Sequence, residues 1–158
     1  MTTVDRPPPA LLDVNVLVAL AWPNHEGHVA ARTWFLEESG RGWATTPVTE
    51  LGFVRISSNR VVMPTATTPA RAIDLLGRLT ARPGHRFWPD PVPLVTGRSG
   101  GQPQGPSELR GHRQVTDAHL LALCVHHGGR LATFDRAVLD LAGADDALVH
   151  LLRAEAGL

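Results

Sequence analysis

Four carboxylates occupy positions from which they could act together. Asp13 interrupts the aliphatic run LLDVNVLVAL, residues 11–20, where an unpaired buried charge would be costly. Asp135 follows the apolar stretch RLATF, while Glu50 and Asp117 each lie near the start of an expected helix. In an α/β protein the carboxyl ends of parallel strands and the amino ends of helices share one edge of the sheet, where ligands bind. We therefore expect the four acids to converge at that edge.

A cluster of this kind suits a divalent cation. Carboxylates brought close together repel one another and raise each other's pKa values. Mg²⁺ or Mn²⁺ would relieve the repulsion, because hard cations prefer oxygen ligands. An ion held in this way can bind phosphate oxygens and lower the pKa of an attacking water, which indicates hydrolysis of a phosphodiester. Taken singly, Asp117 and Asp135 could instead support helix caps, and Glu50 could be a solvated helix residue.

Short apolar runs alternate with helical patterns along the chain. We expect strands over residues 10–14, 43–46, 85–88, 130–134 and 147–151, and helices over 16–22, 28–38, 47–57, 69–81, 116–127 and 137–141. Thr68 and Thr116 are expected to cap the helices that they precede, and Gly128-Gly129 to end the helix before it. In the 69–81 helix, the side chains expected to face the core are those of Ala72, Ile73, Leu75, Leu76 and Leu79.

This alternation predicts an α/β protein whose parallel sheet is covered on both faces. A length of 158 residues fits one domain, which we place at residues 10–158 after a flexible lead-in of residues 1–9. Residues 89–111 include a stretch rich in Gly and Pro that predicts a loop. A loop of this length in a compact domain is expected to be either disordered or involved in handling a substrate.

The composition excludes several classes of protein. The net charge is zero, so the chain lacks the overall basic character of many nucleic-acid binders. All fifteen cations are Arg, which excludes Schiff-base chemistry and the lysine-dependent phosphatases and receiver domains that also place an Asp after their first strand. Four of the eight His, at positions 112, 119, 126 and 127, lack the spacing of a zinc site. Cys124 is the only cysteine, so the chain cannot form an intrachain disulfide. No apolar run is long enough to span a membrane. Since no signal peptide is evident either, we expect a cytoplasmic protein.

Three motifs in this order resemble those of PIN domains. They are LLDVNVL, TPVTELGFVR and VTDAHLLALCVHHGGRLATFDR, and the resemblance runs from about residue 10 to 151. Within that family the chain is similar to VapC-type toxin ribonucleases of bacterial toxin–antitoxin pairs. The resemblance implies a PIN-like three-layer α/β/α sandwich with a central, mostly parallel sheet. The segment 97–107 departs from the pattern because it is longer than usual in the family.

The resemblance also implies roles for individual residues. Asp13, Glu50, Asp117 and Asp135 would form a catalytic quartet that binds Mg²⁺ or Mn²⁺, supported by Asn15, Thr116 and Thr133. Arg98, Arg110 and Arg113, in or beside the long loop, could contact phosphates of RNA.

The same resemblance implies partners. These are a VapB-type antitoxin that occludes the acidic groove, an RNA substrate such as tRNA or rRNA, and a second copy of the chain in a homodimer. The alternative reading is a catalytically inactive PIN fold kept for binding a partner.

Overall fold

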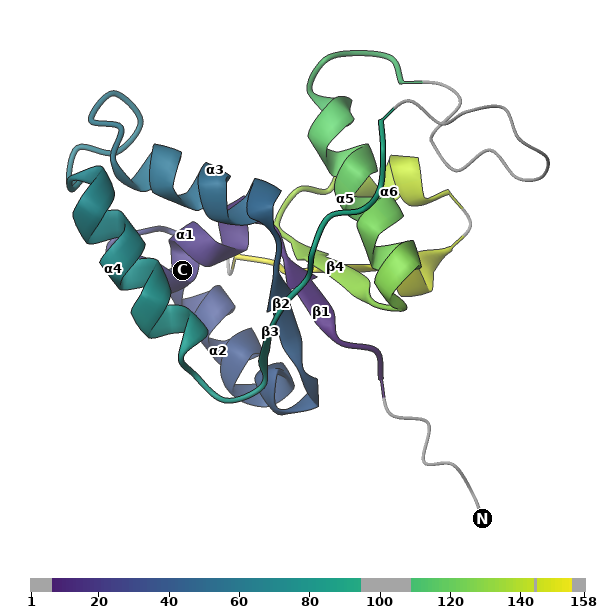
Figure 1. The fold of residues 1–158 in the computed structure, drawn as a ribbon, viewed down its shortest axis with the longest axis horizontal. Coiled ribbons are helices and arrows are strands. Elements are labelled where there is room, and N and C mark those ends of the chain that lie inside the picture. Colours follow the sequence, from purple (N-terminus) through teal and green to yellow (C-terminus); the bar gives the residue numbers. More distant parts are fainter. Residues whose placement is uncertain (1–6, 95–108, 144, 155–158) are drawn as a thin grey trace.

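The computed structural model describes residues 7–94, 109–143 and 145–154. Five strands and six α-helices alternate along these residues (Figure 1). The strands are β1 Ala10–Leu12, β2 Trp43–Thr45, β3 His85–Phe87, β4 Arg130–Thr133 and β5 Val149–Leu151. The helices are α1 Val14–Ala21, α2 His28–Glu38, α3 Pro47–Ser57, α4 Pro69–Thr80, α5 Gln114–His127 and α6 Val138–Ala142, with short 3-10 turns at Ser39–Arg41 and Asp146–Leu148. None of the helices in these ranges is both long and apolar enough to cross a membrane.

The sheet has the order β3-β2-β1-β4-β5, and every pair of neighbouring strands is parallel. The α/β/α sandwich expected from the sequence is thereby confirmed. The chain winds outward from β1 to β3 and then returns to the other side of β1 through β4 and β5. Such a reversal opens a crevice at the carboxyl ends of the two strands between which it occurs. Here those strands are β1 and β4, so a ligand site is expected just beyond Leu12 and Thr133.

Two apolar clusters cover the two faces of the sheet. One packs α1, α2, α3 and α4 against one face, and the other packs α5 and α6 against the opposite face (Figure 1). Side chains along a strand point alternately to the two faces. Leu12 and Ala132 accordingly belong to the first cluster, whereas Leu11 and Leu131 belong to the second. Cys124 is buried in the second cluster.

The Gly128-Gly129 turn ends α5, as the sequence predicts. Gly128 has a φ of 67°, a left-handed conformation that glycine adopts without strain. Gly129 is required for a different reason: a Cβ there would collide with the indole of Trp88 and lie 2.7 Å from the carbonyl oxygen of Pro9. This close approach lets α5 turn directly into β4.

Several predicted boundaries are wrong. β1 ends at Leu12 and α1 begins at Val14, because the side chain of Asp13 caps the helix at once. α5 begins at Gln114, so Thr116 lies inside the helix and does not cap it. The last strand begins at Val149, since a 3-10 turn occupies the residues before it. Ile73, which we expected to face the core, is 56% exposed.

Candidate active site

Asp13 lies at the point where β1 leaves the sheet and α1 begins. Its Oδ1 accepts a hydrogen bond from the backbone N–H of Val14 (2.7 Å), and its Oδ2 accepts one from the hydroxyl of Thr133 (2.7 Å). The residue is only 8% exposed. A carboxylate inside an aliphatic run is therefore tolerated because both oxygens meet donors.

Thr133 links the loops that follow β1 and β4. Besides donating to Asp13, its hydroxyl accepts hydrogen bonds from Nδ2 of Asn15 (3.2 Å) and from the backbone N–H of Asp135 (3.0 Å). The side-chain oxygen of Asn15 in turn accepts from the backbone N–H of Phe134 (3.2 Å). These bonds hold the segment carrying Asp13 and the segment carrying Asp135 in a fixed relation.

Three of the four acids interact electrostatically. Burial, followed by the charges of Asp13 and Asp135, raises the pKa of Asp117 to about 6. Burial also raises the pKa of Asp13, with a smaller contribution from the charge of Asp135, while the hydrogen bonds from Thr133 and Val14 act in the opposite direction. The strand ends and the first turns of α5 thus concentrate negative charge at one place.

This concentration of charge predicts that the Asp117→Asn variant is more stable than the wild-type protein in EDTA at pH 7.5. The pKa of Asp117 rises on folding from 3.8 to about 6, so the folded protein holds the proton more tightly than the unfolded chain does. Stability consequently falls as the pH rises from about 4 to 6, and the full penalty applies above that range. A shift of this size corresponds to about 3 kcal/mol for a fully buried carboxyl, and partial access to solvent reduces it to about 1 kcal/mol.

Urea unfolding at pH 7.5 and at pH 4 would measure this effect. We expect a gain of about 1 kcal/mol in the variant at the higher pH and a much smaller difference at the lower pH. An equal change at both pH values would mean that packing, and not charge, is responsible.

Glu50 has different partners. Its Oε1 accepts a hydrogen bond from the hydroxyl of Thr45 (2.7 Å), and that hydroxyl also lies 2.8 Å from Nε2 of His85. Burial lowers the pKa of His85, and the charge of Glu50 opposes this shift. Among the residues that the structure describes, no group of three or more His, Cys, Asp and Glu side chains is arranged to hold a metal ion. Asp13, Asp117 and Asp135 gather their charges at one edge, while carboxylate oxygens of Asp13, Glu50 and Asp135 accept hydrogen bonds from protein donors.

Three of the remaining residues singled out from the sequence lie on α5 or just before it. Thr116 is exposed on α5 one residue before Asp117. Arg110 and Arg113 are also exposed, and Arg113 occupies the position that precedes the first turn of α5. Arg98 lies outside the described residues.

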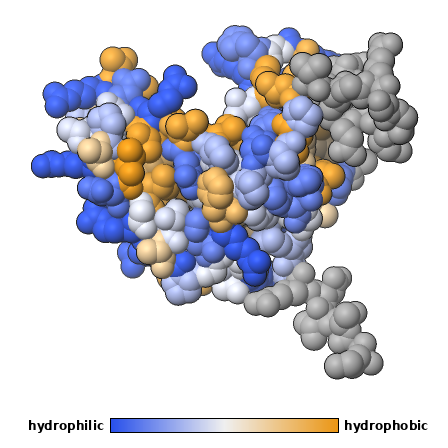
Figure 2. All heavy atoms as spheres, in the orientation of Figure 1, coloured by the Kyte–Doolittle hydropathy of each residue, from blue (hydrophilic) through white to orange (hydrophobic). Residues whose placement is uncertain are grey.

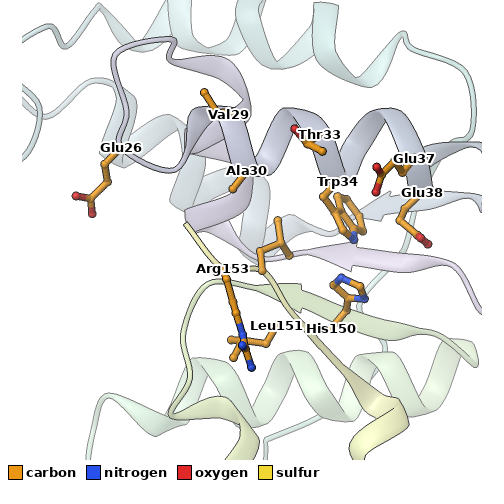
Figure 3. Close-up of a pocket in the computed structure, with 11 residues that line it drawn as sticks. Glu26, Val29, Ala30, Thr33, Trp34, Glu37, Glu38, His150, Leu151 and Arg153 are labelled. Carbon is orange, nitrogen blue, oxygen red and sulfur yellow. The ribbon is translucent and has the colours of Figure 1, made fainter. Parts of the chain in front are cut away.

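Hollows on the surface identify further residues near the acids. A hollow of about 640 Å³ is lined by Asn15, Phe134 and Arg136 together with residues of the C-terminal segment. Sequence reasoning missed Arg136, although it directly follows Asp135 in the motif LATFDR. A second hollow, of about 560 Å³, lies between α2 and β5 and contains none of the four acids (Figure 3). Glu38, which lines this hollow, pairs with Arg130 at 2.9 Å.

A pair missed by sequence reasoning fixes the segment after β3. Nε2 of His119 lies 2.6 Å from Oδ2 of Asp90, and both side chains are largely buried. His127, two turns further along α5, stacks on Trp88 and lies within hydrogen-bonding distance of the carbonyl oxygen of Pro89 (2.9 Å). These contacts hold residues 88–90 against the helix that carries Asp117.

Comparison with known proteins identifies the family. The PIN domain model matches residues 10–144, which is most of the chain and includes all four acids. The chain belongs to the PIN domain family. Ribonuclease VapC39 of Mycobacterium tuberculosis is 57% identical over 143 residues, covering 90% of this chain and 99% of that protein. Ribonuclease VapC38 of the same organism is 50% identical over 133 residues (84% and 89%), and ribonuclease VapC44 is 43% identical over 129 residues (82% and 87%).

These relatives confirm the resemblance drawn from the three motifs. The PIN domain match begins at the first residue of β1 and continues beyond α6. It therefore covers every element that positions Asp13, Asn15, Thr133 and Asp135, and it includes α3 and α5, which carry Glu50 and Asp117.

Proposed function

We propose that this PIN domain is a metal-dependent endoribonuclease and the toxin of a type II toxin–antitoxin pair. The observation that carries the proposal is that one hydroxyl, of Thr133, bonds both Asp13 and the backbone of Asp135, with Asp117 near enough for their charges to raise its pKa. The relatives named above, each a ribonuclease of the VapC type, supply the substrate class. tRNA or rRNA would be the RNA that is cut, leaving a 3′-hydroxyl and a 5′-phosphate.

The donor set fits a hard divalent cation. Asp13, Asp117 and Asp135 offer carboxylate oxygens, and their mutual repulsion would be relieved by a doubly positive charge. Glu50 would join them by turning away from Thr45. When bound, Mg²⁺ or Mn²⁺ would neutralise charge on the phosphate and lower the pKa of the attacking water.

The chain's own residues would order the site. Thr133 fixes the rotamer of Asp13 by its hydrogen bond, and Asn15 holds Thr133 and the backbone at Phe134. Arg136, in the hollow beside these residues, could pair with a phosphate next to the scissile bond. Arg98, Arg110 and Arg113 remain candidates for further phosphate contacts, and the 89–111 loop for handling the substrate.

A cognate VapB-type antitoxin would inhibit the enzyme by covering the acidic groove. An Arg of the antitoxin that reached Asp13, Asp117 and Asp135 would replace metal charge with guanidinium charge. A homodimer and a cytoplasmic location, where RNA and antitoxin are found, are part of the same proposal.

A purified sample incubated with total bacterial RNA tests this function. We expect cleavage with Mg²⁺ or Mn²⁺ and none in EDTA, and mapping of new 5′ ends would identify the RNA and the cut site. If no cellular RNA is cleaved with either ion, the alternative of a catalytically inactive PIN fold that binds a partner would replace the proposal.

A further inference from the structure

Positive charge is concentrated in the helical hairpin formed by α3 and α4, although the whole chain is neutral. Between residues 51 and 82 there are five arginines and one acid, Asp74, so the segment carries a net charge of +4. The rest of the chain has ten arginines and fourteen acids, which gives −4. The net charge is therefore zero although positive and negative charges are unevenly distributed along the chain. We call the basic set the arginine arm: Arg55, Arg60, Arg71, Arg78 and Arg82.

The arginine arm is open to solvent and lacks neutralising partners among the described residues. All five arginines are exposed. The ion pairs of the described residues involve other side chains, namely Arg41 and Arg130 with Glu38, and His119 with Asp90. Arg82 lies over the ring of Phe35, 5.7 Å from its centroid, a contact that holds the guanidinium without cancelling its charge.

The spacing on α4 lines up three of these charges. Arg71, Arg78 and Arg82 are separated by seven and four residues, which places them on one stripe of the helix and its extension. The stripe spans about 16 Å at 1.5 Å per residue. The core-facing side of the same helix consists of Ala72, Leu76 and Leu79. Arg78 lies in the last turn of α4, where a positive charge favours the helix, whereas Arg71 in the first turn and Arg82 beyond the end of the helix have no such role.

The first turn of α3 borders the edge where the acids lie, and α4 runs back along the outer flank to the amino end of β3 (Figure 1). α3 begins directly after the carboxyl end of β2, and the hairpin then extends to the outer flank of the molecule (Figure 1). In the space-filling view, a notch separates the hairpin from α5, and hydrophilic side chains cover the outer side of the hairpin (Figure 2). A long polyanion with one phosphate at the acids would reach the arm by crossing α3, which carries Arg55, before it met Arg71 in the first turn of α4.

We propose that the arginine arm binds the phosphate backbone of the RNA substrate at a distance from the scissile bond. This inference rests on the proposed ribonuclease function. Guanidinium groups bind phosphate oxygens in a bidentate manner, and such contacts position a nucleic acid without reading its sequence. The arm thus selects RNAs that are long or folded enough to reach from the acids to α4, and it contributes affinity rather than catalysis.

The test compares two matched double variants, both made in an Asp13→Asn background that prevents cleavage. The arm variant is Arg71→Gln with Arg78→Gln. The control is Arg32→Gln with Arg41→Gln, which removes two exposed arginines from α2 and the 3-10 turn that follows it. Binding to a fluorescein-labelled 24-nucleotide RNA hairpin is followed by fluorescence anisotropy between 50 and 300 mM KCl. Circular dichroism verifies that both variants fold.

We expect the arm variant to bind about tenfold more weakly at 100 mM KCl, and the control within about twofold of its parent. The slope of log K against log salt concentration should become less steep by about two in the arm variant, one for each lost phosphate contact. Equal affinities for the arm variant and its parent would overturn the inference. The inference would also be overturned if the arm variant bound RNA normally but lost affinity for phosphatidylserine vesicles or for an acidic protein.

Cleavage assays separate this inference from the ribonuclease proposal. With Asp13 restored, the arm variant should raise KM about tenfold and leave kcat within about twofold, because its contacts lie away from the reacting phosphate. If the wild-type chain cleaves RNA and the arm variant binds it normally, only the inference fails. If the wild-type chain cleaves nothing but the arm variant loses RNA affinity, only the ribonuclease proposal fails.

Discussion

The Asp13→Asn variant is expected to cleave RNA about 10³-fold more slowly than the wild-type protein. The carboxylate of Asp13 lies at the crevice between β1 and β4 and contributes negative charge to the acidic edge. An amide of the same shape removes one full charge and an anionic ligand oxygen, so metal binding and water activation should both suffer. Initial rates on a defined RNA at saturating Mg²⁺ measure the loss.

The fold should survive this change. The amide oxygen can still accept one of the two hydrogen bonds that Asp13 receives from Val14 and Thr133. Loss of the other bond is offset because an amide carries no buried charge. We expect a change in unfolding free energy within about 1 kcal/mol, seen as a shift of a few degrees in the melting temperature.

Asp140→Asn provides the matched control, since Asp140 is an exposed carboxylate on α6 outside the acidic edge. It should retain full activity. A residual activity above about a tenth of the wild-type rate in Asp13→Asn would show that Asp13 does not hold the metal, and the assignment of the site would have to move to other residues.

The sequence predicted that Asp13, Asp117 and Asp135 lie close together, because each follows an apolar strand or opens a helix. For Asp13, Asp117 and Asp135 this reasoning needs only the parallel sheet and its switch point, and both are features of the alternation of elements. The exact ends of β1 and α1 were not predictable in the same way. Asp13 ends the strand and also caps the helix. The second role depends on its side chain turning back to the N–H of Val14, which the sequence alone does not show.

The partners of Glu50 and Thr116 depend on long-range geometry. Glu50 meets Thr45 and His85, and His85 lies on a strand forty residues further along the chain than Thr45. No pattern of neighbouring residues in the sequence predicts a contact between side chains so far apart in the chain. Thr116 looked like a cap because hydroxyl residues often precede helices, but α5 begins two residues earlier.

Thr133 is the residue whose replacement should have the second largest effect. Its hydroxyl is fully buried and takes part in three hydrogen bonds, donating to Asp13 and accepting from Asn15 and Asp135. The Thr133→Val variant keeps the shape of the side chain and removes all three bonds. Two partly buried donors and one buried carboxylate oxygen then lose their partner.

We expect Thr133→Val to lower the unfolding free energy by about 3 kcal/mol and the rate of RNA cleavage by about 10²-fold. The loss of rate follows because the carboxylate of Asp13 is no longer held in one orientation and the backbone at Asp135 is released. Urea unfolding and initial rates measure the two effects.

The Thr133→Ser variant distinguishes the effect of the hydroxyl from that of the methyl group. Serine restores all three hydrogen bonds and removes only a buried methyl, which costs about 1 kcal/mol. A positioning role predicts that Ser recovers the rate to within about threefold of wild type. It also predicts that Val raises the Mg²⁺ concentration needed for half-maximal cleavage, a quantity that lower stability alone leaves unchanged while the protein is folded. If Val and Ser shift the Mg²⁺ dependence equally, the hydroxyl does not orient Asp13, and its three hydrogen bonds serve the fold alone.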